Sequence, residues 1–241
     1  MLPGSYGLTR KFSSKVNSYY SARLKLNTIG FILYKINVNK VELCETGSTI
    51  ANCLNPITVS KVGLSTEVDL ASITAGESAA TLGNFGLAKT GVSYTFIQVT
   101  MSRLIKIKGS ASDGTTTCFT KGNGNLDGTM GIATTTSGQS TVADLFVPPF
   151  VDPTDFPDLN SVADADGSSP RISGTINAAD SHFQARQPLS KPFTLDPSAI
   201  PTVKIAFGTA TALTVNEAAG CNTAAQMHAS PPDSTVTIQG Q

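Results

Sequence analysis

The chain of 241 residues has no tryptophan, and its five tyrosines all precede residue 95. Carbohydrate platforms commonly stack sugar rings on these two side chains, so their distribution lowers the expectation of lectin-like binding. Charged residues make up 14% of the chain, compared with ~25% in typical soluble domains. The 17 basic residues balance 17 acidic ones, and this balance predicts no nucleic-acid partner.

Familiar catalytic motifs are also missing from the sequence. The two histidines, His182 and His228, are isolated, and neither belongs to an H-E-x-x-H zinc motif. No G-x-S-x-G nucleophile elbow occurs, and the cysteines lack the C-x-x-C spacing of a zinc site. The sequence therefore assigns no catalytic, cofactor-binding or metal-ligating residue, and it predicts that the protein is not an enzyme.

Long hydrophobic runs are absent. The first apolar run, IGFILY at 29–34, is much shorter than the ~20 residues of a transmembrane helix, and no transmembrane segment is predicted. Residues 1–41 contain seven basic residues and no acidic one. We interpret residues 1–28 as a basic leader or disordered arm, because no clean hydrophobic period crosses them.

Alternating hydrophobic residues predict a protein built almost entirely of strands. In 94–109 the apolar Ile97, Met101 and Ile105 lie on one face of a single long strand, with Gln98 and Thr100 opposite. In YKINVNKVEL at 34–43 the apolar parity changes after Val38, which predicts a β-bulge at Asn39–Lys40. Further strands are expected at 202–208, 212–215 and 235–238.

Two turn-rich stretches interrupt this pattern. The Gly/Thr-rich stretch 109–141 is expected to form loops with one or two short strands. The Asp/Pro-rich stretch 148–170 is expected to be a long surface connection without a regular strand, because proline cannot donate to a sheet. The predicted fold is all-β: residues 29–241 form a single two-layer antiparallel β-sandwich of prealbumin/immunoglobulin-like type with long loops.

The runs KVELCETGS and VDLASITAGESAATLGNFGLAKTGVSYTFIQVTMSR resemble exported bacterial β-sandwich proteins of unknown activity. They are also distantly similar to the prealbumin-like, carbohydrate-binding-like domains of secreted lipoproteins. The resemblance covers about residues 34–108 and lies in core and turn positions. It implies a sandwich fold and export, and it implies no activity.

The Asp-rich loop 152–166 is the best candidate for ligand chemistry, because calcium favours several oxygen ligands on a flexible chain. The segment VADADG has the D-x-D-G core of a calcium loop, but Val162 and Ser173 occupy the first and twelfth ligand positions and break the EF-hand pattern. No metal site is therefore assigned, and calcium binding stays an alternative. The oxygen-bearing side chains of the loop are Asp152, Asp155, Asp158, Asn160, Asp164 and Asp166.

Arg103 interrupts the apolar face of the 94–109 strand, between Met101 and Ile105. Either a bulge turns it outward, or it is buried and paired with a carboxylate such as Glu42 or Asp69. In both cases its role is structural.

The four cysteines allow three pairings, and loop geometry favours Cys44–Cys53 and Cys118–Cys221. Cys44 follows a strand that ends at Leu43, and the turn residues of ETGSTIAN return the chain to a next strand near Ile57. The alternative is four free thiols in a cytosolic protein. Disulfides predict an extracellular, periplasmic or cell-surface location.

These observations favour a non-enzymatic exported or cell-surface β-sandwich protein with a structural, adhesin-like or binding role. One alternative is a carbohydrate-binding module on the same scaffold. A second is a calcium-dependent hydrolase that uses the Asp-rich loop. No cofactor is expected, and the partners considered are polysaccharide or other surface proteins.

Overall fold

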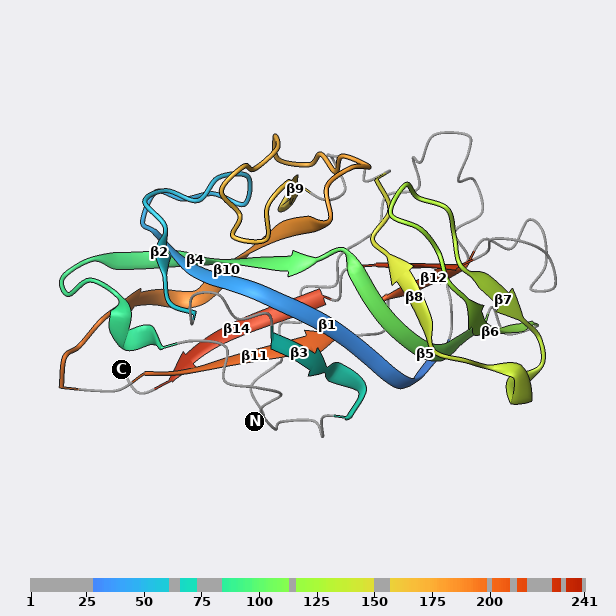
Figure 1. Ribbon diagram of the computed structural model, residues 1–241. Coiled ribbons are helices and arrows are strands. Elements are labelled where there is room, and N and C mark those ends of the chain that lie inside the picture. The colour runs from blue at the N-terminus through green and yellow to red at the C-terminus, as the bar shows by residue number, and fades with distance from the viewer. Residues whose placement is uncertain are drawn as a thin grey trace.

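The protein is mostly β, with curled and largely antiparallel sheets (Figure 1). The structure, a computed structural model, describes residues 28–60, 66–72, 84–112, 116–149, 157–198, 201–208, 212–215, 227–230 and 233–239. Helical structure in these ranges is limited to the 3-10 turns Leu70–Ser72, Phe85–Leu87 and Ser137–Gln139. No helix in the described ranges is long and apolar enough to cross a membrane. Residues 1–27 of the predicted arm lie outside the described residues.

One large sheet has the order β11-β14-β10-β4-β1-β5-β6-β7, and β12 and β13 form a separate pair. Strands β2 and β3 also pair with β1, β8 pairs with β5, and β9 pairs with β10. The predicted strands at 202–208, 212–215 and 235–238 are confirmed as β11, β12 and β14. The strands are β1 Thr28–Glu45, β2 Ile57–Thr58, β3 Thr66–Asp69, β4 Ser93–Ser102, β5 Leu104–Ser112, β6 Thr117–Gly122, β7 Ile132–Thr134, β8 Ala143–Phe146, β9 Leu159–Val162, β10 His182–Thr194, β11 Thr202–Gly208, β12 Leu213–Val215, β13 Met227–Ala229 and β14 Asp233–Gln239.

Strand β1 is the long spine of the sheet and contains the predicted bulge. Val38 pairs with Met101 and Lys40 with Thr100, so Asn39 is the extra residue. The bulge lets Ile36 and Val38 on one side of it, and Val41 on the other, all enter the core. The β-bulge predicted from the parity change in the sequence is therefore confirmed.

The predicted long strand at 94–109 is instead two strands, β4 and β5, which pair with successive halves of β1. Between the pairs Val38–Met101 and Lys35–Lys106, β1 contributes two residues (36 and 37) and the partner strand four (102–105). Arg103 lies in this interruption. Its backbone N–H donates to Ser181 O and its carbonyl accepts from Val147 N, so the backbone at this point bonds to two other segments.

The Asp/Pro-rich stretch was expected to lack a strand, and this expectation is wrong. Strand β9 forms between Pro157 and Pro170, where no proline interrupts the backbone, and it pairs with β10. All four residues of β9 are buried. In Figure 1 the chain after β9 forms a broad loop beside β10 before it returns into that strand.

The hydrophobic core follows the apolar positions of the central strands. Its largest fully buried apolar side chains come from β1, β4, β5, β8, β9, β10 and β12, and Tyr94 stacks on Phe193 with ring centroids 6.2 Å apart. They are Tyr34, Tyr94, Phe183, Phe193, Leu43, Ile97, Ile105, Ile107, Leu145, Leu159 and Leu213.

The predicted Cys44–Cys53 disulfide is present, with a Cα–Cα distance of 5.1 Å. Strands β1 and β2 form the expected antiparallel pair beside it, with Leu43 opposite Ile57. No cysteine in the described ranges is free. Cys221 lies outside those ranges, so the Cys118–Cys221 pairing stays a prediction.

Candidate functional site: a buried polar layer

Eight polar residues form two rows across β1, β4, β10 and the start of β9. The register places Lys40 opposite Thr100, Thr100 opposite Gln184, and Gln184 opposite Asn160. In the second row Glu42 lies opposite Gln98, and Gln98 opposite Arg186. Residues directly opposite each other in a sheet point to the same face. We call this set the polar layer: Lys40, Glu42, Gln98, Thr100, Asp158, Asn160, Gln184 and Arg186.

Apart from Lys40, whose side chain is 25% exposed, the polar layer is buried. Its β4 members nevertheless alternate with apolar residues, as on a solvent-facing strand. Thr100 and Asn160 have no exposed surface, and Gln184 is 3% exposed. The loop after β9 covers this face. Gly167 lies so close that a Cβ atom there would be 2.8 Å from Gln184 Nε2 and 2.9 Å from Thr100 Oγ1. Its φ of +73° also favours glycine.

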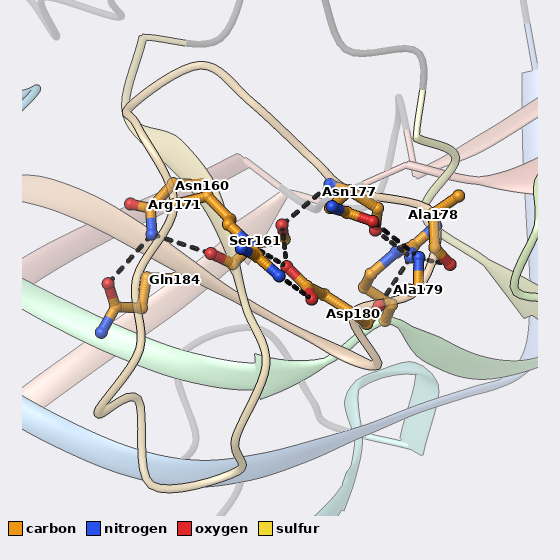
Figure 2. A network of polar contacts seen from close by, with 9 residues as sticks. Asn160, Ser161, Arg171, Asn177, Ala178, Ala179, Asp180 and Gln184 are labelled. Carbon is orange, nitrogen blue, oxygen red and sulfur yellow. Dashed lines mark hydrogen bonds and ion pairs between the residues drawn. The ribbon is translucent and has the colours of Figure 1, made fainter.

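Hydrogen bonds link most members of the layer. Glu42 accepts from Gln98 Nε2 at 2.9 Å, and its other oxygen lies 2.7 Å from Lys40 Nζ. Asn160 donates to Gln184 Oε1 at 3.1 Å and accepts from Arg186 Nη2 (Figure 2 shows Asn160 and Gln184). Burial lowers the pKa of Arg186, and the negative charge of Asp158 opposes that change.

Two buried polar atoms of the layer have no hydrogen-bond partner within the described part of the chain: Thr100 Oγ1 and Arg186 Nε. A buried polar group without a partner costs roughly 1–3 kcal/mol. Such atoms are rare in folded proteins and call for water or a ligand.

Arg103 is fully buried, so the prediction that a bulge turns it outward is wrong, and the predicted carboxylate partners Glu42 and Asp69 are wrong as well. Its guanidinium instead donates to five backbone carbonyls, from 2.6 Å (Asp180) to 3.3 Å (Ala178). Burial lowers the pKa of Arg103 to about 10 and the Asp180 charge opposes this, so the side chain stays protonated at neutral pH. The accepting carbonyls are those of Leu126, Val147, Asn177, Ala178 and Asp180.

Asp180 ties the loop after β9 to β9 itself (Figure 2). Its carboxylate accepts from Arg171 Nε at 2.9 Å, from Arg171 Nη2 at 3.0 Å and from Ser161 Oγ at 2.7 Å. Ser161 Oγ in turn accepts from the Asn177 backbone N–H at 2.8 Å. The cluster therefore fixes residues 171–180 against the sheet.

Acid is expected to weaken this cluster. Hydrogen bonds from Arg171 lower the pKa of Asp180 most, and Ser161 adds to the effect. Because the folded pKa lies below the unfolded value of ~3.9, the stabilisation is complete above pH ~4 and is lost as the pH falls through the folded pKa. Urea unfolding of the natural protein should therefore lose free energy below pH 4 more steeply than unfolding of Asp180→Asn. Parallel pH profiles for the two proteins would contradict this role of Asp180.

The structure separates the residues of the Asp-rich loop. Asp158 and Asn160 belong to the buried polar layer, whereas Asp164 and Asp166 lie in an exposed turn and cap the Ser168 hydroxyl and N–H. Asp152 and Asp155 lie outside the described residues. Within the ranges that the structure describes, no three Asp, Glu, His or Cys side chains converge as metal ligands.

Sequence reasoning missed the polar layer, because Gln98 and Thr100 look like solvent-facing strand residues. The only available signal was the cluster of uncharged polar residues in the LNSV and HFQARQ segments, at 159–162 and 182–187. No protein-family model matches the chain, and no similar curated protein or solved structure was found.

Proposed function

We propose that the protein is a non-enzymatic β-sandwich protein that is exported to the cell surface, the periplasm or the extracellular space, where it has a structural or adhesin-like role. The Cys44–Cys53 disulfide is the observation that carries the proposal, because disulfides persist mainly in oxidising compartments. The predicted resemblance of residues 34–108 to exported bacterial sandwich proteins implies the same location, and that resemblance stays a prediction.

The hydrogen bonds that the buried charged groups make within the protein support a structural role. Arg103 is held by backbone carbonyls, and Asp180 by Arg171 and Ser161. Arginine and carboxylate side chains in these positions fix loops onto the sheet. A carboxylate such as Asp180 is a group that an acid–base mechanism could otherwise use.

Alkylation of the unreduced protein, isolated from its natural compartment, tests the location. Mass spectrometry is expected to find Cys44 and Cys53 joined and unmodified, and Cys118 joined to Cys221. The same protein, reduced before alkylation, should gain four labels and serves as the control. Four labels without reduction would contradict both the pairing and the extracellular assignment.

A carbohydrate-binding role is the second candidate, and the polar layer is the observation that favours it. Its amides, carboxylates, guanidinium and hydroxyl offer the donors and acceptors that sugar hydroxyls use. A glycan array is expected to show binding to at least one polysaccharide class. Absence of binding across a broad panel would contradict this role and leave the structural role in place.

A further inference from the structure

The polar layer is closed by the turn Asp164–Ser169, hereafter the 164–169 turn. The ends of the turn are fixed, since Val162 forms a β-bridge with Pro170 and Arg171 N donates to Ser161 O at 2.8 Å. Its tip is held far less firmly. One hydrogen bond joins the tip to the layer, from Gln184 Nε2 to Gly167 O, and its length is 3.5 Å.

The remaining hydrogen bonds of the tip are internal to the turn, and the charge of Lys40 attracts Asp166 across the exposed surface. Gly167 N donates to Asp164 O at 3.0 Å, and Ser168 N donates to Asp166 Oδ1 at 2.9 Å. Apart from Gly167, the residues of the turn are exposed. The tip can therefore lift as a unit while its own bonds and both anchored ends persist. Few contacts to the rest of the fold are the mark of a segment that opens locally.

Lifting the tip would uncover an unfilled hydrogen-bonding site. Thr100 Oγ1 and Arg186 Nε have no partner among the described residues, and Thr100 and Arg186 are 0% and 4% exposed. Gln184, which lies opposite Thr100, would lose its bond to Gly167 and offer its amide as well. The opened site then presents a hydroxyl and a carboxamide on two adjacent strands, and the Arg186 Nε donor lies in the next row of the layer.

The chemistry of the layer indicates which ligand would fit. Lys40 and Arg186 are balanced by Glu42 and Asp158, so the site has no net charge for an ion to neutralise. Amide, carboxylate and guanidinium groups in close rows match neighbouring hydroxyls, each of which both donates and accepts. A neutral ligand with several adjacent hydroxyls satisfies these groups better than an anion, a cation or an apolar molecule.

We propose that the polar layer is a saccharide-binding site and that the 164–169 turn is the lid that must lift before the sugar binds. The proposal rests on the carbohydrate-binding role and assigns its site and its gate. Recognition there uses hydrogen bonds from the sheet face in place of aromatic stacking.

Three variants test the site and the gate. Thr100→Val keeps the side-chain shape but removes the hydroxyl, and it should weaken saccharide binding about tenfold. Gly167→Ala introduces a Cβ that contacts Thr100 and Gln184 in the closed form, so it should favour the open form and tighten binding severalfold. Thr95→Val is the matched control, because Thr95 Oγ1 is also a buried atom without a partner on β4 but lies outside the layer. It should leave binding unchanged.

The probes are soluble cello-, manno-, galacto- and chito-oligosaccharides of four to six units, titrated calorimetrically into each full-length protein whose thermal unfolding shows that it is folded. Amide exchange at 164–169 should increase when the oligosaccharide binds. If Thr100→Val and Gly167→Ala bind with the affinity of the natural protein, the sugar lies elsewhere, and the proposed site is wrong while the carbohydrate role stands. If no oligosaccharide binds the natural protein or Gly167→Ala, both are wrong.

Discussion

Replacement of Arg103 by methionine is expected to destabilise the protein by about 4 kcal/mol and to lower its Tm by roughly 10 °C. Methionine fills a similar volume but donates no hydrogen bond, so five backbone carbonyls lose a buried charged donor at once. The accepting segments lie as far apart in sequence as Leu126 and Asp180, and the loss would therefore loosen two loops together. Thermal and urea unfolding measure the effect.

Two further variants test whether the stability depends on the several N–H donors of the Arg103 guanidinium. Arg103→Lys retains the charge but places it on a compact ammonium that cannot reach carbonyls in several directions, so an intermediate loss is expected. Arg171→Met removes an arginine whose side chain is 45% exposed, but it leaves the buried Asp180 carboxylate without its main partner, so a loss of about 2 kcal/mol is expected. A loss for Arg103→Met no larger than that for Arg171→Met would show that the carbonyl bonds contribute little.

Gly131→Ala is expected to be the second most damaging change, at about 3 kcal/mol. A Cβ at this position would lie 2.3 Å from Leu145 Cδ2 and 2.6 Å from the Gly122 carbonyl oxygen. The leucine can rotate, but the carbonyl belongs to the neighbouring strand and cannot move without breaking the pairing of β6 with β7. Gly131 also exchanges two backbone hydrogen bonds with Met227, of 2.7 and 2.9 Å, so this bridge between the residue before β7 and strand β13 should weaken too.

The matched control is Gly138→Ala, because a Cβ added at Gly138 has no heavy atom within 4 Å. The free energy of unfolding, measured in urea, should change by less than about 1 kcal/mol in this variant. The loss expected for Gly131→Ala is about 3 kcal/mol. Equal effects of the two substitutions would mean that the close approach at Gly131 is relieved by a small backbone shift.

The sequence predicted those features of the fold that depend on neighbouring residues. The change of parity after Val38 located the bulge, because side chains alternate strictly along a strand and an extra residue must reverse them. The spacing of Cys44 and Cys53 around turn residues predicted their disulfide, because a short turn is sufficient to bring the two cysteines together. Both features are determined within some twenty residues.

Features that depend on distant segments were missed. The parity of Gln98 and Thr100 was correct, but periodicity cannot say what covers a face, and the covering turn lies more than sixty residues later in the chain. Arg103 was judged from the carboxylates near it in the predicted sheet. Its partners are main-chain carbonyls, which every residue possesses and which therefore leave no trace in a sequence. The strand β9 was missed because the proline count of the whole stretch concealed a proline-free segment.

The order in which the strands leave the ribosome gives the polar layer a further consequence. Strands β1, β4 and β5 are complete by Ser112, whereas β9 and β10 follow only after residue 158. If these three strands pair before β10 is made, the edge of β4 stays unpaired in the meantime, because long-range pairings of this kind form slowly. An unpaired edge is a template for aggregation. In such a sheet Lys40, Glu42, Gln98 and Thr100 face water, so this face stays hydrated until the loop after β9 covers it.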